Sequence, residues 1–215
     1  MSQFLGNLPA DPGDAVFPAA DYFLGIAQRV IASGVNTRVI LEGRGEVSLF
    51  PGRHEYSAKI PDQAEFFQAP AAQFSTSPLD AAERPQNPRH ISELLWQAGF
   101  HASQGRMVEG TSKYDVIQFR RWPNLPHLPK TANTARICAL LTRHPMTIML
   151  VHRQLGIEKD EVYRVYSAAH SAGISYLVSQ NLQAIEGDAT KAGPAAAPQE
   201  RVSLLRSLFS KVAGL

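Results

Sequence analysis

Residues 131–180, TANTARICALLTRHPMTIMLVHRQLGIEKDEVYRVYSAAHSAGISYLVSQ, decide the expected fold of the C-terminal part of this chain. Apolar residues recur there at helical spacing in three separate runs, which are bounded by Pro145, Gly156 and Gly173. Proline stops a helix because it lacks a donor, and glycine ends one because it adopts a positive φ at little cost. The apolar run 174–178 follows the last glycine. The pattern predicts three short helices followed by a strand.

The pattern resembles the winged-helix domains of bacterial regulators in the segment LLTRHPMTIMLVHRQLGIEKDEVYRVYSAAHSAGI. Gly156 lies at the expected inter-helix turn, and the closing Ala-Gly-Ile leads into a wing strand. The resemblance implies a winged-helix domain over 131–180. More loosely, the whole chain is similar to uncharacterised proteobacterial proteins in which a Trp-Pro segment such as Arg121-Trp122-Pro123 precedes this module. Neither likeness brings a catalytic motif with it.

A winged helix that reads DNA places its third helix in the major groove, with donors such as Arg or Asn near the start of that helix. Here the third helix is expected to open at Lys159-Asp160-Glu161, so two carboxylates stand where donors are needed. Carboxylates in a first turn stabilise the helix dipole but repel phosphates. We therefore expect protein contact, with DNA binding as the alternative. The residues that would contact DNA are Arg143, Arg153, Lys159 and Arg164.

Composition excludes several classes of protein. The chain has 215 residues, of which 44% are hydrophobic, and its formal net charge is +2 without a block of Lys and Arg. This balance argues against nucleic acid or an anionic membrane as the main partner. The single cysteine, Cys138, cannot form an intramolecular disulfide and suits a reducing compartment. The start of the chain lacks the features of a signal peptide, and no run approaches the ~20 apolar residues of a membrane span. We expect a cytoplasmic protein.

The N-terminal part predicts an α+β domain over 17–122, after a flexible arm over 1–16. Alternating apolar residues and glycine-containing turns indicate an antiparallel meander that packs against amphipathic helices. A further apolar segment ending at Trp122 has apolar residues on both faces, and we expect it as a central strand of the same sheet. The expected helices are 17–33 and 88–104, and the expected strands are 37–42, 46–50, 54–60 and 114–122.

Prolines and small residues mark the boundaries of these domains. Three prolines predict an extended connector over 123–130, and the segment 181–199, rich in Ala, Gly and Pro, predicts a linker. The segment 200–215 predicts an amphipathic helix, which is too short to be stable alone in water. It would dock on its own chain, on a partner protein, or weakly on a membrane surface. Its protein-binding residues would be Leu205, Leu208, Phe209 and Val212.

Catalytic chemistry has no support in the sequence. The chain lacks a nucleophile elbow, a phosphate-binding loop, a His-Glu-x-x-His motif and a Cys-x-x-Cys pair, so we expect no catalytic residue, no metal site and no cofactor. Four arginines lie in two hairpin turns and at one strand end, where they could gather around a phosphate-bearing ligand such as a cyclic dinucleotide. The simpler interpretation is that they solvate the edges of the sheet. They are Arg44, Arg53, Arg120 and Arg121.

The sequence thus predicts a non-enzymatic bacterial signalling or regulatory adaptor. It would bind another protein through the sheet domain and the tail, with the winged helix as a protein-contact module, and homodimerisation is left open. Two alternatives remain: a transcription regulator that uses the winged helix on DNA, and a sensor of a nucleotide ligand.

Overall fold

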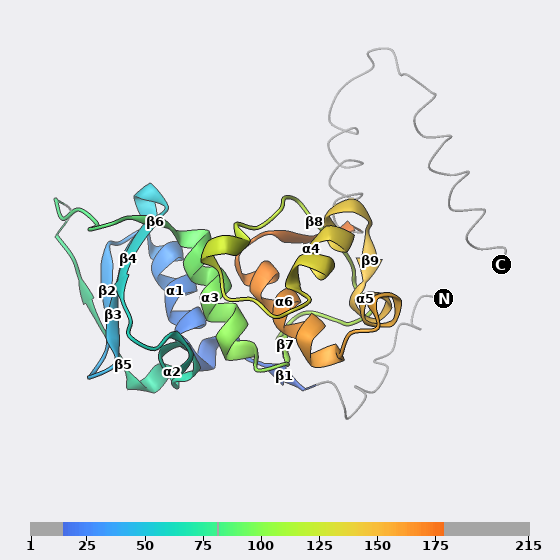
Figure 1. The fold of residues 1–215 in the computed structure, drawn as a ribbon. Coiled ribbons are helices and arrows are strands. Elements are labelled where there is room, and N and C mark those ends of the chain that lie inside the picture. The colour runs from blue at the N-terminus through green and yellow to red at the C-terminus, as the bar shows by residue number, and fades with distance from the viewer. Residues whose placement is uncertain (1–14, 81, 179–215) are drawn as a thin grey trace, which may run out of the picture. The chain divides into compact units, whose positions relative to one another are not determined.

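A five-stranded antiparallel sheet forms the N-terminal part of the protein, whose computed structural model describes residues 15–80 and 82–178 (Figure 1). The meander predicted within 37–60 is confirmed, because its three strands are consecutive neighbours in the sheet. Two further strands extend its edges and give the order β5-β2-β3-β4-β6. The strands are β2 (Thr37–Leu41), β3 (Gly45–Phe50), β4 (Glu55–Lys59), β5 (Phe74–Pro78) and β6 (Arg89–His90).

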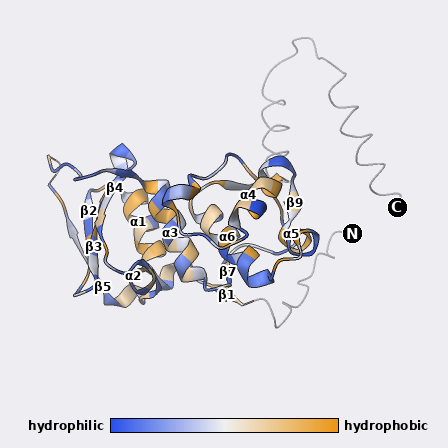
Figure 2. Cartoon of the chain, in the orientation of Figure 1, coloured by the Kyte–Doolittle hydropathy of each residue, from blue (hydrophilic) through white to orange (hydrophobic). Residues whose placement is uncertain are grey.

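Helix α1 (Phe23–Ser33) covers one face of this sheet and is apolar along most of its length (Figures 1 and 2). The short helix α2 (Gln63–Gln68) completes that layer with Phe66 and Phe67, which are fully buried. The predicted helix 17–33 begins too early. Residues Val16–Phe17 instead form β1, which pairs in parallel with β7 (Met107–Val108), and a 3-10 helix, Ala19–Asp21, follows. Residues 16 and 17 are extended because they pair with β7, and the Glu109 backbone N–H donates to the Phe17 carbonyl.

The three helices predicted within 131–180 are present. They are α4 (Thr134–Arg143), α5 (Ile148–Leu155) and α6 (Lys159–Ser171), and β10 (Ser175–Leu177) follows as the predicted strand. Gly156 ends α5 with a φ of 63°, the left-handed conformation that commonly ends a helix, so the turn predicted at this glycine is present.

One strand expected in the first sheet belongs to a second sheet. Strand β8 (Val116–Phe119) is the centre of a three-stranded antiparallel sheet, between β10 and β9 (Met146–Thr147). The placement of the strand predicted over 114–122 in the N-terminal sheet is therefore wrong, although the strand is central in its own sheet. Its expected cover on both faces is also wrong, because burial alternates along β8 and Val116 is 42% exposed. Its buried residues Ile117 and Phe119 pack into the core around α4, α5 and α6.

Helix α3 (Ile91–Ser103) lies between the two cores (Figure 1). Leu94 and Ala98 pack toward α1 and the first sheet, whereas Trp96 and Phe100 pack toward α6. The indole N–H of Trp96 donates to the Pro129 carbonyl at 3.1 Å, which fixes the segment predicted as a connector against the helix. The described residues consequently belong to one compact unit, and they form an α+β fold. The predicted linker 181–199 and tail 200–215 lie outside the described residues, as does most of the predicted arm 1–16.

Gly99 allows α3 and α6 to approach closely. A Cβ atom at Gly99 would lie 2.6 Å from the Ser171 Oγ and 2.9 Å from the Ser167 carbonyl oxygen. Both distances are shorter than packed atoms tolerate, so the helices would have to separate.

We predict that Gly99→Ala lowers the free energy of unfolding by about 1–3 kcal/mol, although alanine is the better helix former. Urea unfolding followed by circular dichroism measures the change. Gly52→Ala is the matched control, because a Cβ there meets nothing within 4 Å and its effect should stay within about 0.5 kcal/mol. An unchanged midpoint for Gly99→Ala would show that the two helices do not pack this closely.

Candidate protein-contact surface

Three large apolar side chains are exposed on adjoining segments of the C-terminal part. Tyr114, Val116 and Leu150 leave 63%, 42% and 48% of their surface exposed. We name them the apolar surface. Among the described residues, the other large apolar side chains with comparable exposure are Val16, Val35 and Trp122, which come from separate segments. The apolar surface is thus the place where the described chain gathers such side chains.

The backbone holds the apolar surface together. The Met149 N–H donates to the Lys113 carbonyl at 3.2 Å, which joins the start of α5 to the turn that carries Tyr114. Val116 pairs with Thr147 in the register of β8 and β9. The Thr147 hydroxyl in turn caps α5 by accepting the Leu150 N–H at 3.3 Å. All three exposed side chains are therefore set by one network of strand pairing and helix capping.

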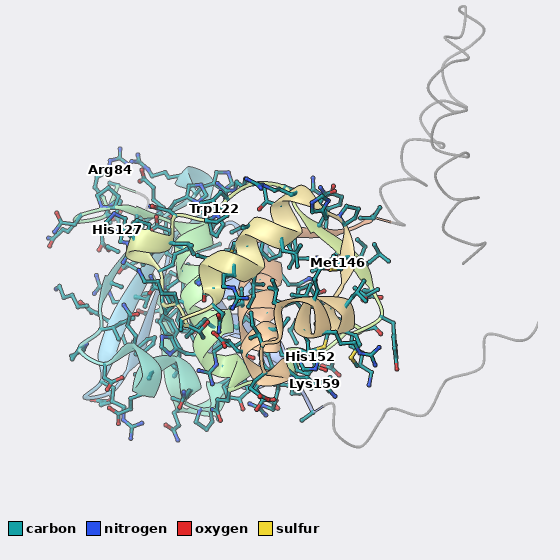
Figure 3. All side chains as sticks on the ribbon, turned by 45° about the vertical axis from the view of Figure 1, so that its right-hand side comes forward. Arg84, Trp122, His127, Met146, His152 and Lys159 are labelled. Atoms are coloured by element: carbon teal, nitrogen blue, oxygen red, sulfur yellow. The ribbon has the colours of Figure 1, made fainter. Side chains whose placement is uncertain are left out.

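Cations lie near the apolar surface. Leu150 and Arg153 are both exposed and lie one turn apart on α5, so they share a face of that helix. The Lys113 ammonium lies 5.2 Å from the centre of the Tyr114 ring. Arg143 is exposed at the end of α4, shortly before Met146, which marks this side of the molecule in Figure 3. The surface therefore combines apolar area with positive charge.

The four residues proposed for DNA contact do not form one stripe. Arg143 and Arg153 are exposed near the apolar surface, but the Arg164 guanidinium lies 5.5 Å from the centre of the Phe100 ring on α3. Lys159 lies partly buried at the start of α6, beside the end of α5 (Figure 3). Of the 13 residues of α6, seven are buried, because α3 covers one side of the helix and α4 and α5 cover another. A helix enclosed in this way exposes little surface that could enter a groove of DNA.

The acidic start of α6 has a structural role. The Glu161 carboxylate accepts hydrogen bonds from both the backbone N–H and the side-chain amide of Asn133, each at 2.9 Å. Asn133 is the N-cap residue of α4, although its side chain makes no capping hydrogen bond there, so Glu161 ties the beginnings of two helices together. Burial raises the pKa of Glu161, but hydrogen bonds from Thr131 and Asn133 outweigh burial, and the net pKa is lowered.

The four arginines proposed for a phosphate-bearing ligand are not gathered at one site. Arg44 precedes β3 and pairs with Glu65 at 3.2 Å, whereas Arg53 follows β3. The length of β3 separates these two turns by roughly 17 Å at the usual rise of a strand. Arg120 lies over the Tyr176 ring at 4.9 Å, and Arg121 reaches the Ser92 hydroxyl at 3.5 Å.

Two observations on the described residues concern nucleophilic and metal-binding side chains. Cys138 is buried, and burial raises the pKa of its thiol to about 12, so it is not an activated nucleophile. Between residues 15 and 178, apart from position 81, no group of three or more His, Cys, Asp or Glu side chains could hold a metal ion. In the same part of the chain no helix is long and apolar enough to cross a membrane. The predicted contact residues Leu205, Leu208, Phe209 and Val212 lie outside the described residues.

Comparisons with protein-family models, with characterised proteins and with solved structures found no match to this chain. The site must therefore be judged from its geometry alone. Sequence reasoning missed the apolar surface, because Val116 and Leu150 fit the apolar patterns of a strand and a helix. Tyr114 was expected at the start of the strand 114–122, whereas it lies in the turn that precedes β8.

We predict that Glu161→Gln lowers the free energy of unfolding at pH 7 by about 1 kcal/mol, because two hydrogen bonds to a charged acceptor are weakened. The folded-state pKa lies below the ordinary 4.5, so this stability is present above pH 4.5 and is lost as the pH falls through the folded pKa. Urea unfolding between pH 3 and 7 should show the wild type and Glu161→Gln converging at low pH. Glu158→Gln is the control, because Glu158 is exposed and makes no capping hydrogen bond with its side chain. A difference that is constant across this pH range would contradict the assigned role.

Proposed function

We propose that this protein is a non-enzymatic bacterial adaptor in signalling or regulation, and that it binds another protein in the cytoplasm. The observation that carries the proposal is the apolar surface of Tyr114, Val116 and Leu150. Contiguous exposed apolar side chains on a folded protein are typical of interaction sites, and aromatic and arginine residues are enriched in interfaces. The nearby Arg143 and Arg153 favour a partner that presents apolar and acidic side chains.

The module of α4, α5, α6 and the small sheet would serve as a winged helix used for protein contact. Its element types support this proposal: three consecutive helices, a following strand and a three-stranded antiparallel sheet. The apolar surface lies on the strand-and-turn side of that module, at β8 and the start of α5. The predicted tail, with Leu205, Leu208, Phe209 and Val212, would provide a second contact with the partner.

The geometry of α6 disfavours the DNA-binding alternative. A reading helix needs a free face with donors, whereas α6 is packed on several sides and its first turn carries Asp160 and Glu161. Glu161 is already engaged by Asn133, and Arg164 is engaged by Phe100. We therefore favour protein contact over DNA contact.

The protein-contact proposal predicts the behaviour of a double variant, Tyr114→Asp with Leu150→Asp. Both side chains are largely exposed, so the melting temperature should change little, but burial of two charges should abolish partner binding. Quantitative affinity capture from native lysate should recover one protein with the wild type and lose it with the double variant. Val35→Asp is the matched control, because Val35 is 51% exposed and lies between α1 and β2, outside this module. Equal recovery by all three proteins would refute the proposed surface, and sedimentation of the purified wild type would show whether the partner is a second copy.

The same proposal predicts no sequence-specific DNA binding at physiological salt, where specific readers reach ~10⁻⁸ M or tighter. A selection of genomic fragments by the purified protein tests this. Enrichment of a defined motif, with affinity lost in Arg164→Ala, would instead establish a transcription regulator.

A further inference from the structure

A concave site lies far from the apolar surface, along the edge of β4. It is a hollow of about 400 Å³ between the outer face of the first sheet and the segment that leads into β6. Arg84 on this segment and Met146 beside the apolar surface lie on opposite sides of the molecule in Figure 3. Its polar lining residues include Arg38, Ser48, Ser57, Lys59, Arg84 and Arg89.

The register of the sheet places a polar row on the floor of this hollow. Arg38 on β2 is opposite Ser48 on β3, and Ser48 is opposite Ser57 on β4. Their neighbours Val47 and Leu49 point into the core, so this row faces away from α1. Ser48 is only 9% exposed, yet neither its hydroxyl nor that of Ser57 has a hydrogen-bond partner among the described residues. Two hydroxyls thus line the hollow with their hydrogen-bonding capacity unused.

Positive charge exceeds negative charge around the hollow. Four cations line it, and with Glu93, which pairs with Arg89 at 2.9 Å, three carboxylates oppose them. Lys59 pairs with Glu46 at 3.2 Å. Arg38 pairs with Glu83 at 2.9 Å, but its Nε is buried and has no partner within the described residues. Arg84 is exposed, and no described residue pairs with it. Half-exposed ion pairs contribute little to stability, so the Arg38 guanidinium can exchange Glu83 for another anion.

Further hydrogen-bonding groups come from the edge of β4. Strand β6 pairs with β4 only through Glu55 and Tyr56, so β4 continues beyond its neighbour. Because backbone groups alternate along a strand, those of Ala58 face the same side as those of Tyr56, where no strand follows. The Gln97 side-chain amide donates to the Tyr56 hydroxyl at 3.3 Å at the base of the hollow. The site therefore offers several neutral donors and acceptors beside its cations.

The lining also indicates which anion would fit. The aromatic rings at the hollow belong to Phe50 and Tyr56, which are each 1% exposed, so a nucleobase would find no ring to stack on. A hydroxyl-rich ligand would instead match the serine hydroxyls and the free backbone groups. The volume lies at the lower end of the ~300–1,000 Å³ typical of small-molecule sites.

We propose that this hollow binds a small sugar phosphate. Arg38 and Arg84 hold the phosphate, and the Ser48 and Ser57 hydroxyls with the Ala58 backbone hydrogen-bond the sugar. The site is independent of the protein-contact surface and of the arginines expected from the sequence.

Isothermal titration of the full chain with glucose 6-phosphate tests the proposal, with glucose, inorganic phosphate and adenosine monophosphate as the other ligands. Glucose 6-phosphate should bind more tightly than any of the three. Arg84→Gln and Ser48→Ala should each weaken binding, Arg84→Gln by about tenfold because a charged hydrogen bond is lost. Arg29→Gln, an exposed arginine on α1, is the control and should bind like the wild type.

Several outcomes would overturn the proposal. One is the absence of heat from glucose 6-phosphate at millimolar concentration, and another is equal affinity for inorganic phosphate, which would remove the role of the sugar contacts. Tighter binding of adenosine monophosphate would assign the site to nucleotides instead. Wild-type affinity in Arg84→Gln, with an unchanged melting temperature, would place the anion elsewhere.

Discussion

The close contact between α3 and α6 is the constraint on which the rest of this structure depends. Gly99 removes the side chain that would separate the helices, and Ser167 and Ser171 supply small neighbours on α6. Ser167 does more than fill space, because its hydroxyl donates to the Arg106 carbonyl and accepts the Val108 N–H, each at 3.1 Å. One small side chain therefore joins α6 to the strand β7. Tight packing at this position turns two groups of elements into one unit with α3 at its centre.

Local patterns predicted the elements well because each pattern reports on its own segment. Gly34 and Gly156 end helices where their positions in the sequence indicate, and the alternation around Val47 and Leu49 marks a strand with one buried face. The sequence patterns did not predict which elements pack against each other. The segment around Ile117 has apolar residues on both faces, which indicated a cover on each face, yet burial alternates along β8 and Val116 is 42% exposed. Likewise, Trp96 and Leu94 both read as buried on one helix, although they serve different cores. Tertiary pairing of this kind has no local signature.

The candidate sites were harder to predict for a related reason. An apolar residue in a helix or strand pattern is expected in the core, so the sequence did not indicate that Leu150 and Val116 are exposed. Arginines drew attention by their charge, yet β3 keeps Arg44 and Arg53 apart. The acidic residues at the start of α6 stood out in the sequence because carboxylates stabilise the first turn of a helix. Glu161 is engaged in joining α6 to α4 through Asn133, and the sequence does not indicate this contact between distant residues.

The arrangement of α3 also has a consequence for synthesis of the chain on the ribosome. Its Trp96 and Phe100 side is made long before α6, which must cover it, has left the exit tunnel. Strand β1 is made early as well, but its partner β7 is hydrogen-bonded to Ser167 on α6, which is made much later. The nascent N-terminal part therefore presents an uncovered apolar helix face until residue 171 has emerged. Completion of the first sheet alone leaves that face uncovered, and only the packing of α6 removes it from water.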